Sequence, residues 1–174
     1  MKTYLEIKVP IRYDAIWFEE LRRACQHIEV KWQTGFFHIT MAFIDDTPED
    51  VDISTVLQKH LSSFPAPTLT FDKLDVFNTV SGMFIIYLTA TDIPLNYLTL
   101  IQNIRTDLKS IGCLMNSDFR LHVTLGRVKK TTVMLSDIKQ ILCKVSLPAF
   151  SLNLKDVDYR FFRGQTIYET KLNS

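Results

Sequence analysis

The sequence predicts an α+β fold built from two similar lobes. Segments with the two-residue alternation of strands stand beside segments with the three- and four-residue spacing of helices. A strand–helix–strand succession occurs at 3–9, 15–28 and 36–44, and again at 83–90, 94–111 and 119–128. With 174 residues, the chain is long enough for one domain with a substantial apolar core. We therefore expect a single bilobal domain over residues 1–174 with an internal duplication.

The individual elements follow from local patterns of apolar residues. Residues 1–9 alternate between polar and apolar side chains, as in a half-buried strand, and Pro10 ends that strand. Residues 15–28 have apolar side chains at helical spacing behind Asp14, which is the expected N-cap. By the same criteria we expect further helices at 53–61, 94–111 and 136–145. Further strands are expected at 30–33, 36–44, 68–77, 83–90, 119–128, 150–159 and 165–172.

Charge limits the partners that this chain can attract. The formal net charge is +1, so the molecule as a whole has no field that would draw it to nucleic acid or to an anionic membrane. Any attraction for phosphate must therefore be local. We expect a nucleotide or a short RNA as the partner, and neither long duplex DNA nor a membrane.

Cysteine usage and the N-terminal segment indicate a cytoplasmic protein. The three cysteines include no CxxC pair, which argues against a disulfide framework and a thiolate zinc site. Glu6 and Lys8 interrupt the apolar core that a secretory signal needs, and the apolar run at 83–90 is too short to span a bilayer. We expect no metal, no cofactor and, by default, a monomer.

Two strands at equivalent places in the halves contain the same short motif. The first reads Phe37-His38-Ile39-Thr40-Met41, and the second reads Leu121-His122-Val123-Thr124-Leu125. The histidines lie 84 positions apart, close to the offset of the duplication. One such string arises easily by chance in a chain with four histidines, whereas two at matching positions indicate a shared function.

Alternation places the histidine and the threonine of each motif on one face of its strand. The apolar residues of the motif point to the other face, into a core. Strict alternation continues the polar face with Ala42 and Gly126, two small residues that we expect to leave open space. We therefore predict that the two His/Thr pairs form the floor of a groove.

Two imidazoles and two hydroxyls in one groove suit chemistry at a phosphodiester. One neutral histidine can take a proton from the attacking oxygen while a protonated one supplies the leaving oxygen. Threonine hydroxyls can donate hydrogen bonds to the non-bridging oxygens, where negative charge resides. We expect His38 and His122 to be the acid/base pair, and Thr40 and Thr124 to bind the phosphate, with no need for a metal.

The paired motifs resemble those of the 2H phosphoesterase superfamily, which includes 2′-5′ RNA ligase-like proteins and cyclic nucleotide phosphodiesterases. Its signature is two His-x-Thr/Ser motifs about half a chain apart, and in the ligase-like branch the second commonly continues to an arginine, as it does here to Arg127. The first motif departs from many relatives in its continuation Met41-Ala42-Phe43-Ile44, and Leu121 stands where relatives often have a proline before the histidine. Neither departure touches a proton-transferring group.

The resemblance implies two mainly antiparallel sheets that face each other across a groove, with helices outside. It also implies that Arg127 binds phosphate. By strict alternation Arg127 points away from His122, so either the strand bulges near Gly126 and turns it into the groove, or it is a solvated strand end. The family's final hairpin often has a glycine followed by a tyrosine, which suggests Tyr168 as a groove-lining residue or as hairpin packing.

The resemblance further implies a hydrolase for 2′,3′-cyclic phosphates or 2′-5′ linkages of nucleotides or RNA, and in reverse a 2′-5′ RNA ligase. The alternative is a non-catalytic module that binds nucleotides or RNA in the same groove. Recognition alone does not need two proton carriers, so we favour the enzyme. The sequence leaves open the physiological substrate, and which histidine is the base.

Overall fold

Two four-stranded half-sheets form the framework of the computed structural model, which describes residues 1–174. Every strand pair in them is antiparallel. The first half-sheet consists of β10 (Thr166–Lys171), β9 (Asp156–Phe161), β1 (Thr3–Val9) and β3 (Phe37–Ile44). The second consists of β2 (Val30–Trp32), β7 (Val123–Lys129), β6 (Met83–Thr89) and β5 (Lys73–Asn78). The predicted α+β fold with antiparallel sheets is confirmed.

The half-sheets join at one paired position, Ile39 of β3 with Val123 of β7. Both side chains are fully buried. Through this pair the half-sheets become one sheet in the order β10-β9-β1-β3-β7-β6-β5, with β2 also on β7. The two lobes also share one hydrophobic core of 39 buried residues. The two His-x-Thr motifs therefore meet where the lobes meet.

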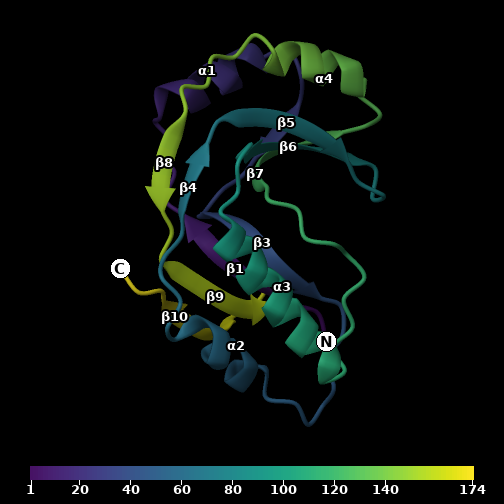
Figure 1. Ribbon diagram of the computed structural model, residues 1–174. Coiled ribbons are helices and arrows are strands. Elements are labelled where there is room, and N and C mark those ends of the chain that lie inside the picture. The colour runs from purple at the N-terminus through teal and green to yellow at the C-terminus, as the bar shows by residue number, and fades with distance from the viewer.

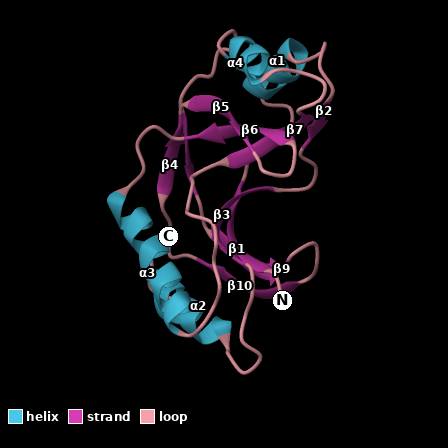
Figure 2. Ribbon diagram, turned by 90° about the vertical axis from the view of Figure 1, so that its right-hand side faces the viewer, coloured by secondary structure: helices cyan, strands magenta, loops and turns pink.

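The helices lie in two pairs at opposite ends of the molecule (Figure 1). Helices α1 (Ile16–Ala24) and α4 (Leu135–Leu142) lie over the second half-sheet, and α2 (Ile53–Leu61) and α3 (Leu95–Ser110) lie along the first (Figure 2). Helix α1 follows a strand of the first half-sheet, yet its Phe18 packs edge-on against Trp32 of β2, with ring centroids 5.7 Å apart. Helix α1 thus follows a strand of the first half-sheet and covers the second, and helix α3 follows a strand of the second half-sheet and covers the first. No helix has the length and apolar character needed to cross a membrane.

Two expected strands are each divided in two. The predicted strand at 68–77 becomes β4 (Thr68–Phe71) and β5, because Asp72 accepts hydrogen bonds from the backbone and hydroxyl of Thr91 and turns the chain there. The predicted strand at 150–159 becomes β8 (Phe150–Asn153) and β9. Strands β4 and β8 pair with each other in a separate two-stranded sheet.

The start of α1 differs from the prediction. Asp14 does not cap the helix, because its carboxylate binds the guanidinium of Arg12 through contacts of 2.9 and 2.7 Å. Ala15 is the N-cap, without a side-chain hydrogen bond, and the helix ends at Ala24 rather than at residue 28.

Candidate active site

The pairing of Ile39 with Val123 fixes how the two motifs face one another. Extended by one residue in each direction, the antiparallel register sets His38 across from Thr124 and Thr40 across from His122. All four side chains are partly exposed, whereas the paired Ile39 and Val123 are buried on the other face. The two histidines thus lie diagonally across the seam between the lobes, each opposite the threonine of the other motif.

Both motif strands bulge directly after their threonine. The register between β1 and β3 shifts between Leu5 and Glu6, which leaves Met41 unpaired. The register between β6 and β7 shifts between Ile86 and Tyr87, which leaves Leu125 unpaired. An extra residue in one strand reverses the alternation beyond it. The duplication therefore extends to an irregularity of the backbone.

The bulge in β7 removes Gly126 from the groove face, so that part of the prediction is wrong, whereas Ala42, although nearly buried, lines a hollow together with Thr40 and His122. Ala42 is 1% exposed, and Gly126 is buried against β2. A Cβ at Gly126 would lie 2.6 Å from Cγ1 of Val30 and 3.0 Å from Cε3 of Trp32. The small residue at this position therefore provides room for Trp32 rather than for a ligand.

The same bulge turns Arg127 to the face of His122 and Thr124. Its Nη1 donates a hydrogen bond to Oε1 of Gln33 at 2.8 Å, and its positive charge lowers the pKa of both His38 and His122. Burial in turn lowers the pKa of Arg127 itself. A half-buried guanidinium near both histidines has the charge and geometry that suit a phosphate anion.

Both histidines lie in surroundings that favour the neutral ring. Burial is the main cause and lowers the pKa of His38 to about 4, with further lowering from the charges of His122, Arg127 and Arg160. Burial also lowers the pKa of His122, helped by the charges of Arg120 and Arg127. A bound phosphodiester would supply the negative charge that favours the protonated form of one of the rings.

Each ring has a backbone carbonyl of the residue two positions earlier beside it, but only that of His122 makes a hydrogen bond with it. Nδ1 of His122 lies 3.0 Å from the carbonyl oxygen of Arg120, two residues earlier. Beside His38 the matching carbonyl is that of Phe36, which raises the pKa of the ring although Nδ1 has no hydrogen bond of ordinary geometry. An Nδ1 that faces a carbonyl carries the proton in the neutral ring, which leaves the lone pair on Nε2. Each Nε2 is then the atom available for proton transfer.

Two adjoining hollows open beside His122. One, of about 230 Å³, includes Thr40 and Phe43 in its lining, and the other, of about 370 Å³, includes Phe77 and Arg120. His38 and Thr124 line neither hollow. Thr40 and Thr124 are both partly exposed, so their hydroxyls can donate to a ligand. Phe77 and Tyr87 set their rings nearly perpendicular to that of His122, with centroids 5.3 and 6.1 Å away.

Sequence reasoning did not single out Glu6, which lies beside His38. Its side chain is 1% exposed, and its Oε2 is 3.5 Å from Nε2 of His38. Its Oε1 is 3.6 Å from Nη1 of Arg160. Burial raises the pKa of Glu6 to about 7, against the lowering charge of Arg160. The sequence signal available was a glutamate on the polar face of the strand that neighbours the first motif.

Tyr168 lies away from the groove. It pairs with Tyr159 of β9, and its side chain packs against the hydrophobic core. The groove face of β9 has Asp158, the neighbour of Glu6, and alternation puts Tyr159 and Tyr168 on the opposite face.

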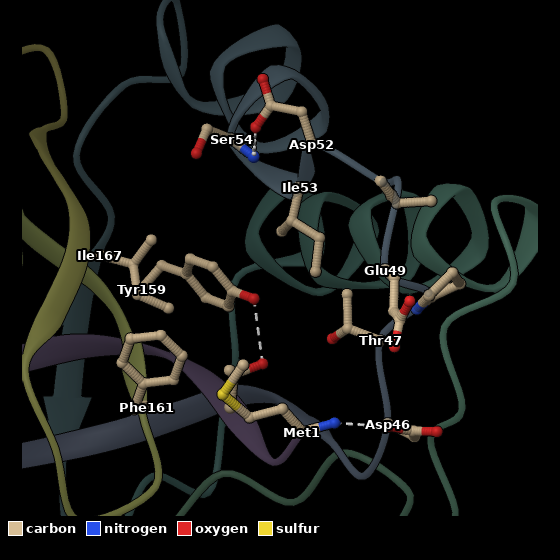
Figure 3. A pocket seen from close by; sticks show the side chains of 13 residues that line it. Met1, Asp46, Thr47, Glu49, Asp52, Ile53, Ser54, Tyr159, Phe161 and Ile167 are labelled. Atoms are coloured by element: carbon tan, nitrogen blue, oxygen red, sulfur yellow. Dashed lines mark hydrogen bonds and ion pairs between the residues drawn. The ribbon is translucent and has the colours of Figure 1, made fainter.

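A hollow of about 630 Å³ lies on that opposite face of the first half-sheet. Figure 3 shows Thr47, Ile53, Tyr159 and Phe161 around it, with the amino group of Met1 bound to Asp46. The hydroxyl of Tyr159 donates to Oγ1 of Thr3 at 3.0 Å. No histidine lines this hollow, and it is separate from the motif residues.

In residues 1–174 no group of three or more His, Cys, Asp or Glu is placed to hold a metal ion.

The family model of the 2′-5′ RNA ligase superfamily matches residues 14–160. None of the curated proteins matches this sequence. Among solved structures, LigT of E. coli in complex with 3′-AMP is 17% identical, with a TM-score of 0.62 and coverage of 99% of this chain and 98% of LigT. The protein TT0787 of Thermus thermophilus is 14% identical, with a TM-score of 0.64 and coverage of 100% and 99%. Usb1 of Kluyveromyces marxianus with uridine monophosphate is 7% identical, with a TM-score of 0.67 and coverage of 98% of both chains.

Proposed function

We propose that this chain, which belongs to the 2′-5′ RNA ligase superfamily, is a phosphodiesterase that acts on 2′,3′-cyclic phosphates or 2′-5′ linkages of nucleotides or short RNA. The observation that supports it best is the pairing of Ile39 with Val123 at the seam, because the antiparallel register extended by one residue puts His38 across from Thr124 and His122 across from Thr40. Two proton carriers and two hydroxyls on one surface match the needs of phosphodiester hydrolysis.

In this proposal the phosphate lies over the seam. The hydroxyls of Thr40 and Thr124 and the guanidinium of Arg127 bind its non-bridging oxygens. One histidine takes a proton from the attacking water through Nε2, and the other gives a proton to the ribose oxygen that leaves. With a 5′-hydroxyl in place of water, the same proton transfers would join it to a 2′,3′-cyclic phosphate end, as a ligase does: the bond from the 5′-oxygen to phosphorus forms as the bond from phosphorus to the 3′-oxygen breaks, and that oxygen takes the proton. None of these steps requires a metal.

The ligands bound to the structural relatives support a nucleotide as the substrate. LigT was solved with 3′-AMP, NADP⁺ and ATP, and Usb1 with uridine monophosphate. The nearly neutral net charge of +1 fits a small substrate that is bound by local contacts. We further propose that the chain acts as a monomer in the cytoplasm.

The test is hydrolysis of nucleoside 2′,3′-cyclic monophosphates, and separately of 2′-5′-linked dinucleotides, by the purified protein in the presence of EDTA. We expect turnover of at least one of the two substrates, and the product isomer identifies the oxygen that leaves. If neither substrate is hydrolysed while both bind, the groove serves recognition, and the catalytic proposal is wrong.

A further inference from the structure

The duplication allows each residue of one lobe to be compared with its counterpart in the other. At the bulge beside the first motif, Glu6 is the partner of Thr40, and beside the second motif Tyr87 is the partner of Thr124. The likeness extends one strand further. Glu6 pairs with Asp158 of β9, and Tyr87 pairs with Asp75 of β5. The two lobes therefore match strand for strand and differ at the residue that contacts the histidine.

The difference changes the chemical surroundings of the two rings. In the first lobe a carboxyl group reaches Nε2 of His38 at 3.5 Å. In the second lobe Tyr87 presents its ring to His122, almost perpendicular at 87°. Both histidines have two aromatic neighbours, so the carboxyl group near Nε2 is the feature that distinguishes His38 from His122.

We propose that Glu6 is a positioning residue that holds a proton for His38, so that His38 is the general acid and His122 the general base of the reaction. This inference rests on the proposed phosphodiesterase function. It assigns to the histidines the roles that their motifs alone, being identical in type, do not distinguish.

The groups around Glu6 support such a role. Tyr4 and Lys8 are its neighbours on the groove face of β1, His38 faces it from β3, and Asp158 and Arg160 face it from β9. Neither carboxyl oxygen of Glu6 makes a hydrogen bond, although both are buried. A buried carboxyl group without a donor is stabilised as the protonated acid, and then it can itself donate to a neutral Nε2. The pKa of about 7 for Glu6 and of about 4 for His38 agrees with a proton that rests on the carboxyl group in the free groove.

Substrate binding would move this proton. The negative charge of the phosphodiester favours the imidazolium, so the proton passes from Oε2 of Glu6 to Nε2 of His38, and Arg160 remains beside the resulting carboxylate. His38 then protonates the leaving ribose oxygen as the P–O bond breaks, while His122 takes one proton from the attacking water. After turnover His122 releases its proton to solvent and Glu6 takes one up, so no proton is gained or lost overall.

The first arm of the test measures protonation without turnover. Ring-nitrogen NMR would follow His38 with pH in the wild type, in Glu6→Gln and in Glu169→Gln, which makes the same chemical change at an exposed residue of β10. We expect His38 to respond in two steps in the wild type and in the control, because the Glu6–His38 pair binds two protons, and in a single step in Glu6→Gln. The same curve in all three proteins would overturn the proposal, whether or not the protein proves to be an enzyme.

The second arm separates an acid from a structural residue. A nucleoside 2′,3′-cyclic phosphate needs a protonated leaving oxygen, whereas the p-nitrophenyl ester of a nucleoside 3′-phosphate releases p-nitrophenolate without one. We expect Glu6→Gln to lower kcat about 10- to 100-fold on the first substrate, with little change in KM, and to leave the ester nearly unaffected. His122→Ala should lower turnover of both. Equal losses on both substrates in Glu6→Gln, or no loss on either, would overturn the assignment of His38 as the acid.

Discussion

Ile39 and Val123 pair across the seam between the lobes, and both are fully buried. They are the one position at which β3 and β7 are paired, and they lie directly between the members of the two His-x-Thr motifs. The geometry of the site therefore depends on one apolar cross-strand pair on the far face of the sheet.

Shortening a side chain of that pair should lower both the stability of the fold and the activity of the site. We expect Ile39→Ala to lower the free energy of unfolding by about 2–5 kcal/mol, because it leaves a cavity in a fully buried place. Urea unfolding measures the loss. Turnover per folded molecule should fall too, since His38 and Thr40 flank the residue on β3. Leu57→Ala, also fully buried but on α2, is the control for a loss of stability alone. Full activity of folded Ile39→Ala would contradict the importance of the seam.

Gly126→Ala should disturb Arg127 through Trp32. The added Cβ would lie 2.6 Å from Val30 and 3.0 Å from Trp32, so the strand must shift, at a cost of about 1–3 kcal/mol. Thermal unfolding and the KM for a cyclic nucleotide measure the two effects. Gly82→Ala has open space around its Cβ but a φ of +82°, and should lower stability without raising KM. A KM unchanged by Gly126→Ala would show that β2 does not help to place Arg127.

Arg127→Ala should weaken phosphate binding by about 10- to 100-fold, the loss expected for a charge-assisted hydrogen bond of about 1.5–3 kcal/mol. Isothermal titration with a nucleoside monophosphate measures it. Lys129→Ala, an exposed cation two residues along β7, should have little effect and serves as the control. Similar losses in both variants would mean that the site attracts phosphate by general charge rather than by the Arg127 contact.

Stability should depend on pH through Glu6 and His38 in opposite directions. The folded chain holds a proton on Glu6 up to a pKa of about 7, against 4.5 ordinarily, so this contribution to stability is lost as pH rises from 4.5 to 7. The pKa of His38 falls from 6.5 to about 4, so its contribution increases with pH between 4 and 6.5. The two contributions offset one another in the wild type.

Glu6→Gln removes the first contribution. Relative to the wild type, we expect the variant to gain about 1–3 kcal/mol of unfolding free energy between pH 5 and pH 8, as measured by denaturant unfolding at each pH. Glu169→Gln should show no such trend. A constant difference across this range would contradict a raised pKa at Glu6.

The sequence predicted the parts of the site that depend on local pattern. The His-x-Thr repeats, the duplication and the fold follow from alternation and from matching spacing, and the pairing of Ile39 with Val123 brings the repeats together. Alternation predicts the wrong face for the residues after Met41 and Leu125, because the position of a bulge depends on which strand lies alongside. The local sequence of a strand does not show which strand will pair with it.

The sequence did not predict the burial of Glu6, for a related reason. Its alternation with Leu5 and Ile7 predicts a side chain on the polar face, which is where it lies. Its burial comes from Asp158 and Arg160, which are more than 150 residues away along the chain. The pairing of β10 with the same strand, β9, also places Tyr168 on the core face. Both outcomes depend on strand order, which periodicity does not give.

In the proposed reaction His38 and His122 act as one acid/base unit. The most direct test is the rate of hydrolysis of a nucleoside 2′,3′-cyclic phosphate by His38→Ala, by His122→Ala and by the double variant, each shown to be folded by its unfolding transition. We predict that each single substitution lowers kcat by about 10²- to 10⁴-fold, and that the double variant is hardly slower than either, because residues that act as a unit do not contribute additively. Retention of wild-type turnover by either folded single variant would contradict the account.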